Sequence, residues 1–373
     1  MKKNKFMFLG MSAIALALSL AFAGCVTVPG EEGTPSAVEA AAQLAAEFNA
    51  IVPGIAEAEG VTVTLTGGVR LEKALTVPAG VTLDLTRETL QLGNNAVLTV
   101  NGTVNARGLM EGGNEESLII DGTVTINGSG TIHLTGKGSL LWIQNCHKLT
   151  LDGVTLVGVA DNIQPLIVIT EGSELILLSG AITGNNNNKD DGWWCGGGVN
   201  VGEQGTFTMS GGTISGNYGS GGGGGVGVQG TFIMSGGTIS GNSGPWGGGG
   251  VAVFDGVGAG FTMTGGVISG NSAKDSGSQG GGVWVNYEAS FTLEGGTIYG
   301  ASEGTNANTA DSDAALLVRT NQSGRTNAGT AKWGTGGTYT MGGVNQTGGS
   351  DILTFDPNAD YGTDETLIAI PAQ

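Results

Sequence analysis

The sequence predicts an all-β fold, a single-stranded right-handed parallel β-helix (a solenoid) with an N-terminal capping α-helix. Three observations favour this fold. From Val61 onward, apolar and polar residues alternate in short runs separated by Gly, Asn or Asp, as in strands followed by turns. After residue 170 the runs repeat, so that GTFTMSGGTISGN returns almost unchanged. Glycine accounts for 73 of 373 residues without a Gly-X-Y period, which excludes collagen.

One substantial helix is expected before the strands. In SAVEAAAQLAAEFNAI, residues 36–51, Ser36 and Glu39 have the spacing of a capping box. The apolar residues between Val38 and Phe48 recur at helical spacing. This segment therefore predicts an amphipathic helix that caps the first coil.

Each repeat of 25 to 32 residues contains three short strands: a Val-x-Val run, a Phe-x-Met run and a Thr-Ile-Ser run. A coil of this kind is typical of a parallel β-helix, in which successive coils stack about 4.8 Å apart. Inward positions then form ladders of like residues. One ladder holds Leu175, Phe207, Phe232, Phe261 and Phe291, and another holds Ile182, Ile214, Ile239, Ile268 and Ile298.

One corner of each coil carries an asparagine. Asn185, Asn217, Asn242 and Asn271 occupy this corner. Glycine allows a positive φ and asparagine tolerates it, so we expect glycines and asparagines to form the corners, with the asparagine amides stacked from coil to coil.

The N-terminus is typical of an exported chain. Three lysines among the first five residues precede a mostly apolar run, 6–22, as in a signal peptide. Cys25 follows Ala-Gly directly and resembles the lipobox of bacterial lipoproteins, although Phe22 stands where Leu is usual. The resemblance implies that Cys25 is diacylated and becomes the mature N-terminus. Simple secretion is the alternative.

The repeat phrases GGGVxV and GTFTMSGGTISGN resemble those of bacterial right-handed parallel β-helix proteins of the pectin-lyase-like superfamily. The closer likeness is to Gly-rich, adhesin-like surface lipoproteins. The resemblance implies architecture more than function, because this superfamily hosts lyases, hydrolases, adhesins and passive spacers. The expected segments are a signal peptide (1–24), a lipidated tether (25–35), a capping helix (36–60), a parallel β-helix (61–345, with clear repeats at about 171–300) and a C-terminal cap or tail (346–373).

The charge balance argues against several partners. A formal net charge of −18 disfavours nucleic acid, anionic lipid headgroups and dense polyanions. The expected contact with a lipid bilayer is therefore through the N-terminal acyl chains. No cofactor is expected, and a surface calcium would find oxygen ligands only in GGNEE at 112–116 or NNNNKDD at 185–191.

Residues suited to catalysis are scarce. Asp190 and Asp191 are the one adjacent acidic pair in the repeats, and Lys274 is the only basic residue between 190 and 300. His147 abuts Cys146, but the sequence offers no third group to orient such a pair. We expect no enzymatic activity, with a polysaccharide lyase or glycoside hydrolase as the alternative. The sequence leaves open whether Cys146 and Cys195 form a disulfide or remain thiols.

Aromatic residues follow the corner asparagines, in the loops that lead to the next Val-x-Val run. Equivalent positions of a solenoid line up, so these rings are expected to form a stripe along one edge. Exposed rings beside amides and carboxylates suit the binding of sugars, whereas the alternative is that the rings cover glycine-rich loops. The candidate ligand-binding residues are Trp193, Trp194, Tyr218, Trp246, Asp190 and Asp191.

The sequence therefore predicts a cell-envelope lipoprotein, exported and lipid-anchored in the outer membrane or at the cell surface. It would present a non-catalytic surface for binding or adhesion, with a glycan or another cell-surface ligand as the partner. A polysaccharide-active enzyme on the same fold and a purely structural spacer are the alternatives.

Overall fold

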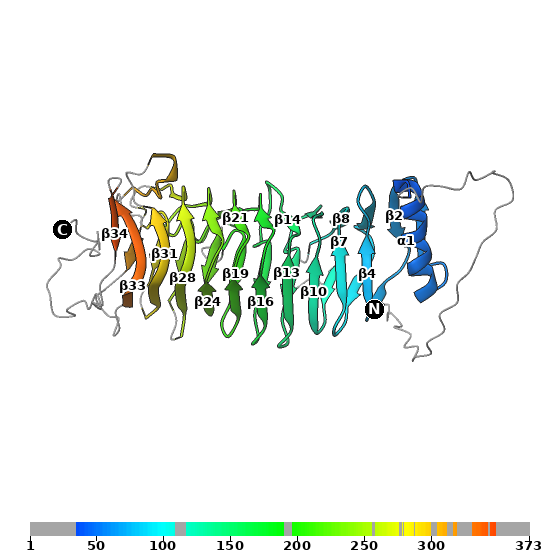
Figure 1. The fold of residues 1–373 in the computed structure, drawn as a ribbon, viewed down its shortest axis with the longest axis horizontal. Helices are drawn as coiled ribbons and strands as arrows, with labels where there is room; N and C mark the ends of the chain where they lie inside the picture. Colours follow the sequence, from blue (N-terminus) through cyan, green and yellow to red (C-terminus); the bar gives the residue numbers. More distant parts are fainter. Residues whose placement is uncertain are drawn as a thin grey trace, which may run out of the picture. The chain divides into compact units, whose positions relative to one another are not determined.

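The chain forms an all-β parallel solenoid with one α-helix ahead of the strands, which confirms the predicted fold class (Figure 1). The predicted segment 1–24, the tether up to residue 34 and the tail from residue 348 lie outside the described residues. The computed structural model describes residues 35–108, 117–189, 196–255, 258–275, 278, 280–286, 288–299 and 304–311, together with the backbone of 316–318, 330–341 and 344–347.

The predicted helix is α1, Ala37–Ile51, and it begins with the predicted capping box. The Ser36 hydroxyl accepts the N–H of Glu39 at 3.3 Å, and the Glu39 carboxylate accepts the N–H of Ser36 at 2.9 Å. The buried face of the helix, which includes Leu44 and Phe48, packs against the first two strands, β1 (Ala56–Glu59) and β2 (Thr62–Leu65). The helix therefore covers the N-terminal end of the solenoid core.

The remaining strands lie in four rows, and each row takes one strand from each successive coil. The first row, with the Val-x-Val runs, is β3 (Val69–Leu71), β6 (Leu90–Leu92), β9 (Leu118–Ile120), β12 (Leu141–Ile143), β15 (Ile167–Ile169), β19 (Val199–Val201), β23 (Val226–Val228), β27 (Val251–Val253), β30 (Val283–Val285) and β32 (Leu316–Val318). The second row, with the Phe-x-Met runs, is β4 (Ala74–Val77), β7 (Val97–Val100), β10 (Thr123–Asn127), β13 (Lys148–Asp152), β16 (Glu174–Leu177), β20 (Thr206–Met209), β24 (Thr231–Met234), β28 (Gly260–Ser269), β31 (Ser290–Tyr299) and β33 (Thr330–Met341).

The third row, with the Thr-Ile-Ser runs, starts at β2 and ends in the second halves of β28, β31 and β33. Between them lie β5 (Thr82–Leu85), β8 (Thr103–Ala106), β11 (Thr131–Leu134), β14 (Thr155–Val157), β17 (Ala181–Thr183), β21 (Thr213–Ser215) and β25 (Thr238–Ser240). The fourth row is short: β18 (Asn186–Asn187), β22 (Tyr218–Gly219), β26 (Ser243–Gly244) and β29 (Ser272–Ala273). The sequence predicts loops at the fourth row, because two-residue strands have no alternating pattern to detect.

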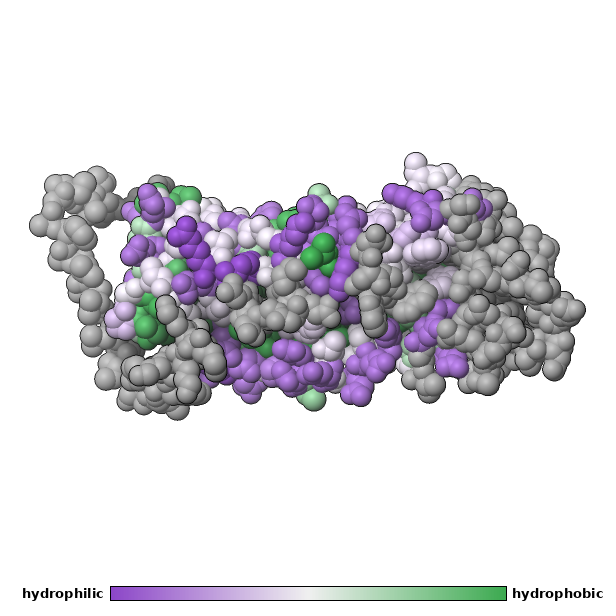
Figure 2. Space-filling model, turned by 180° about the vertical axis from the view of Figure 1, so that it is seen from behind, coloured by the Kyte–Doolittle hydropathy of each residue, from purple (hydrophilic) through white to green (hydrophobic). Residues whose placement is uncertain are grey.

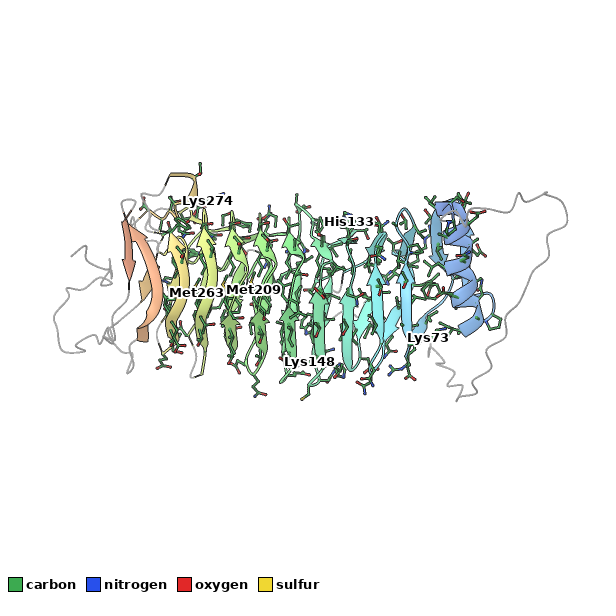
Figure 3. The ribbon with its side chains drawn as sticks, in the orientation of Figure 1. Lys73, His133, Lys148, Met209, Met263 and Lys274 are labelled. Atoms are coloured by element: carbon green, nitrogen blue, oxygen red, sulfur yellow. The ribbon has the colours of Figure 1, made fainter. Side chains whose placement is uncertain are left out.

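Parallel pairing in register brings like side chains together inside the coils, as predicted. Phe207 stacks on Phe232 with ring centroids 4.8 Å apart, and Phe232 stacks on Phe261 at 4.7 Å. Met209 and Met263 lie in the second row, and their side chains are fully buried (Figure 3). The core is therefore a stack of identical layers rather than a cluster of dissimilar side chains.

Antiparallel strands flank the two ends of the parallel rows. The strand β1 pairs antiparallel with β2, and β34 (Val344–Thr347) pairs antiparallel with β33. A sheet edge with unpaired N–H and C=O groups favours association with other chains. The strands β1 and β34 pair with backbone N–H and C=O groups of β2 and β33, which are then not available to other chains.

The described residues that are visible on the face opposite to Figure 1 are mostly hydrophilic (Figure 2). Seen from the side opposite to Figure 1, hydrophobic side chains form only small, separate patches (Figure 2). Outward positions of the strands are commonly Thr, Ser or Asn, as in the Thr-Phe-Thr-Met run of β20, where Phe207 and Met209 are buried. A binding site on this surface is therefore better sought in a groove or at an exposed aromatic ring than in a hydrophobic patch.

Candidate functional site

A buried ladder of asparagines runs along the corner between the third and fourth rows, as predicted. The Oδ1 atom of Asn242 accepts the backbone N–H and the Nδ2 of Asn217, both at 3.0 Å. The Nδ2 of Asn242 donates in turn to the carbonyl of Ile214 and to Oδ1 of Asn271. The ladder is longer than the sequence predicted, and its buried members are Asn162, Asn185, Asn217, Asn242, Asn271 and Asn308.

The residue with a positive φ at this corner is the glycine before each asparagine, in agreement with the glycine corners that the sequence predicts, and the asparagine itself is not left-handed. Gly184, Gly216 and Gly241 precede their asparagines and have φ values of 72°, 64° and 65°. Glycine adopts this conformation without steric cost. The asparagine is then free to point inward, because the turn is complete before it.

These glycines also leave a groove on the outer surface. A Cβ atom at Gly184 or Gly216 would approach no heavy atom closer than 3.9 or 3.7 Å, respectively. A groove of about 400 Å³ lies over them, and its polar lining comes from the fourth row and the residues around it. The side chains that give it chemical character are those of Asn186, Asn188, Tyr218, Ser243 and Lys274.

The register of the fourth row aligns the groove with the solenoid axis. Tyr218 pairs with Asn186 on one side and with Ser243 on the other, and Ser243 pairs with Ser272 of the next coil. At a spacing of about 4.8 Å per strand, the three steps from Asn186 to Ser272 span about 14 Å. The groove can therefore hold an extended ligand rather than a single small group.

The lining is polar and carries little charge. None of the described residues that line the groove has a carboxylate, and Lys274 is the charged residue among them. The Oδ1 of Asn186 has no hydrogen-bond donor among the described residues. Amides, hydroxyls and one aromatic ring therefore dominate the available chemistry.

The structure separates the predicted aromatic residues. Tyr218 lies in the groove, within β22 rather than in a loop. Trp246 follows β26 and is 64% exposed. The backbone at this point is held by the next coil, because the carbonyls of Gly244 and Pro245 accept the N–H groups of Lys274 and Asp275 at 3.0 and 3.1 Å. Trp193, Trp194, Asp190 and Asp191 lie outside the described residues, as does Cys25.

Two other aromatic residues match the alternative interpretation, in which rings shield glycine-rich loops. Trp284 is 2% exposed and contacts Phe254 edge to face, with ring centroids 6.2 Å apart. They form a small cluster with Ala252 on the outside of the first row. A Cβ atom at Gly227 would lie 2.9 Å from the Phe254 ring, so this glycine is needed for the ring to fit.

A cluster of paired charges among the described residues lies at another corner, between the first and second rows. Asp121 accepts hydrogen bonds from Arg70 and from Gln91, the latter at 2.7 Å. The Nε2 of His147 lies 3.5 Å from the same carboxylate, and its Nδ1 lies 2.9 Å from the Ile120 carbonyl oxygen. No local pattern in the sequence indicates this cluster, because 51 residues separate Arg70 from Asp121.

The charged side chains of this cluster are paired with one another. The hydrogen bonds that Arg70 donates to Asp121 and then to Glu72 hold the pKa of its guanidinium above the ordinary value. The Nε atom of Arg70 lies 2.9 Å from Glu72. Lysines of this edge, Lys73 and Lys148, lie across the coils from Lys274 (Figure 3). The paired charges and the groove are therefore two separate features.

The described residues do not test a disulfide between Cys146 and Cys195, because only one of them is described. Cys146 is an exposed free thiol whose Sγ lies 3.4 Å from the Glu171 carbonyl oxygen, and Cys195 lies outside the described residues. The described residues contain no group of three or more His, Cys, Asp or Glu side chains placed to hold a metal ion. The same part of the chain has no helix with the length and hydrophobicity that a membrane crossing requires.

Comparison with known proteins assigns this chain to no family. The chain matches no protein-family model, no curated protein and no solved structure. The parallel solenoid, its asparagine ladder and the groove above it therefore carry the functional argument.

Proposed function

We propose that this chain is a cell-envelope lipoprotein whose solenoid presents a non-catalytic binding surface for carbohydrate, centred on the groove over the asparagine ladder. The observation that carries the proposal is the composition of this groove. An aromatic ring, two amides and a hydroxyl line one continuous channel, in side chains from three successive coils. Sugars offer an apolar ring face and many hydroxyls, which such a lining complements.

Asn186 and Tyr218 give the groove two complementary contacts. Tyr218 is half-buried, so its ring is held by the neighbouring coils while one part stays accessible. Asn186 also lines the groove, and its amide adds a polar group beside the ring. Trp246 lies a few residues beyond Ser243 and is exposed enough to extend the contact surface.

The groove offers poor means for acid–base catalysis. Glycoside hydrolysis commonly uses two carboxyl groups on either side of the scissile bond. The described lining residues include no carboxyl group, and their titratable members are Tyr218 and Lys274. The cluster around Asp121 has the required residue types, but its carboxylate is already occupied by Arg70 and Gln91. These observations favour binding over cleavage.

Membrane attachment belongs to the same proposal and depends on Cys25. An acylated Cys25 would join the acyl chains to the domain through about ten residues, 26–35. The solenoid would then stand at the envelope surface with its groove open to external glycans.

The full chain should be screened against soluble and insoluble polysaccharides, with and without calcium, scoring retention and depolymerisation separately. We expect retention without new reducing ends. Tyr218→Ala should abolish most of the retention, because it removes the ring that lines the groove. Trp142→Ala is the matched control, since Trp142 is a half-buried aromatic residue on the first row.

Each outcome is decisive. Depolymerisation would contradict the non-catalytic proposal and favour the polysaccharide-active enzyme. Failure to retain any polysaccharide would favour the structural spacer. Equal losses in Tyr218→Ala and Trp142→Ala would show that the groove is not the binding site.

A further inference from the structure

Lys274 gives the groove a local charge opposite to that of the whole protein. The chain has a formal net charge of −18, and Lys274 is the only basic residue between 190 and 300. It nevertheless lines the groove, at the end formed by the coil of β29. A single cation at one end of a neutral lining is a specific arrangement in such an acidic protein.

The ammonium group of Lys274 makes no ion pair with any described residue, whereas those of Lys137 and Lys148 each do. Lys137 pairs with Asp161 at 2.9 Å, and Lys148 pairs with Glu174 at 2.8 Å. Lys274 is exposed, and its backbone is fixed by the hydrogen bond to Gly244. Its charge is therefore available to a ligand.

Hydroxyl groups lie beside this charge. Ser243 and Ser272 are paired in register, and Ser243 lines the groove together with Lys274, which follows the end of β29. An ammonium group with neighbouring hydroxyl donors suits a carboxylate or sulfate oxygen.

We infer that the groove recognises a largely neutral glycan bearing an isolated acidic sugar, with the acidic group bound at Lys274. This inference rests on the proposed function and specifies its ligand. The neutral part of the glycan lies along Tyr218 and Asn186, and the acidic residue lies at the β29 end.

The charge of the whole protein explains why the acidic sugars must be sparse. A polymer with a charge on every sugar meets one cation and the repulsion of many surrounding carboxylates. A single acidic group within the groove lies next to Lys274, where the attraction is local and is screened less than the distant repulsion. The arrangement therefore selects against dense polyanions.

The test uses the full chain and pairs of probes that differ only in charge. Each uronate-containing polysaccharide, among them glucuronoxylan with its sparse uronates and polygalacturonate with its dense ones, is compared with its own carboxyl-reduced form. Sulfated glycans are compared with their desulfated forms. We expect tighter binding to the sparse acidic form than to its neutral counterpart, and weaker binding to polygalacturonate.

Lys274→Gln should weaken binding of the acidic form about 2- to 5-fold, the range of one exposed ion pair, and leave the neutral form unchanged. Lys73→Gln removes the same charge from the opposite edge and should change neither (Figure 3). Preference for sulfated over uronate probes would identify the acidic group as sulfate.

Equal binding of acidic and neutral forms, or equal effects of the two lysine variants, would overturn the inference and leave carbohydrate binding intact. Tight binding of polygalacturonate would also overturn it. Loss of all glycan binding in the wild-type chain would refute the proposed function itself.

Discussion

The Oδ1 atom of Asn242 accepts two hydrogen bonds from Asn217, one from its backbone N–H and one from its Nδ2, both at 3.0 Å. The same relationship recurs between Asn242 and Asn271. Asn242 and Asn271 therefore each accept the backbone and side-chain N–H groups of the asparagine in the preceding coil. The groove lies directly on this ladder, so the rigidity of the ladder sets the spacing of the groove residues.

Replacing Asn242 with Ala should destabilise the solenoid by about 3 kcal/mol or more. The substitution removes the acceptor of the Asn217 backbone N–H and of one of its two Nδ2 hydrogens, and the donor to the Ile214 carbonyl, in a buried corner, at about 1–3 kcal/mol each. Urea unfolding of the two proteins measures the difference. Asn188→Ala is the control, because Asn188 is exposed, and should stay within about 0.5 kcal/mol. Similar values for the two variants would show that the ladder is dispensable.

Phe232→Ala should be costly because Phe232 is stacked on both sides. Its ring lies 4.8 Å from that of Phe207 and 4.7 Å from that of Phe261, and it is fully buried. We expect a loss of about 3–5 kcal/mol in the free energy of unfolding. Phe232→Leu should lose less than half as much, since it keeps most of the buried volume. A loss below 1 kcal/mol for the Ala variant would contradict a rigidly stacked core.

Glu39 should make the helix cap sensitive to acid. The hydrogen bonds from the Ser36 backbone N–H and then its side chain hold the pKa of Glu39 below its ordinary value of about 4.3. Because the folded pKa is the lower one, the stabilisation is complete above the ordinary value and is lost as the pH falls through the lowered pKa. Glu39→Gln keeps an acceptor but cannot titrate. The stability difference between wild type and Glu39→Gln should therefore shrink between about pH 5 and pH 3, as followed by urea unfolding. A difference independent of pH would refute this role.

Local patterns were sufficient to predict the ladders and the helix, because each depends on residues a few positions apart or on an exact repeat. Lys274 and Ser243 were not predicted to share a groove, since their place depends on how unequal loops fold back onto the fourth row. Asn162 and Asn308 were missed for a related reason: the phrases around them differ from GTFTMSGGTISGN. The sequence predicts the position of a residue within its coil only where the surrounding residues match the repeat.

Cys25→Ala should release the protein from membranes if Cys25 carries the anchor. We expect the wild-type chain to sediment with the envelope fraction and the variant to remain in the soluble fraction, because stable attachment requires two acyl chains. Cys146→Ala is the control for loss of a thiol, since Cys146 lies on the solenoid. Mass spectrometry of the mature N-terminus tests the same point directly. An unmodified N-terminus, or membrane retention of Cys25→Ala, would contradict lipidation.

Trp246→Ala should weaken glycan binding without destabilising the fold. The side chain is 64% exposed, so its removal should change the free energy of unfolding by no more than about 0.5 kcal/mol. If Trp246 extends the surface of the groove, stacking on a sugar ring contributes about 0.5–1.5 kcal/mol, which corresponds to about a 2- to 10-fold loss of affinity. Trp246→Phe should recover most of the loss because it restores a ring. Leu178→Ala removes an exposed apolar side chain at a corner between the second and third rows, and it should leave affinity unchanged. If Leu178→Ala and Trp246→Ala reduce affinity equally, the ring at Trp246 has no specific part in binding.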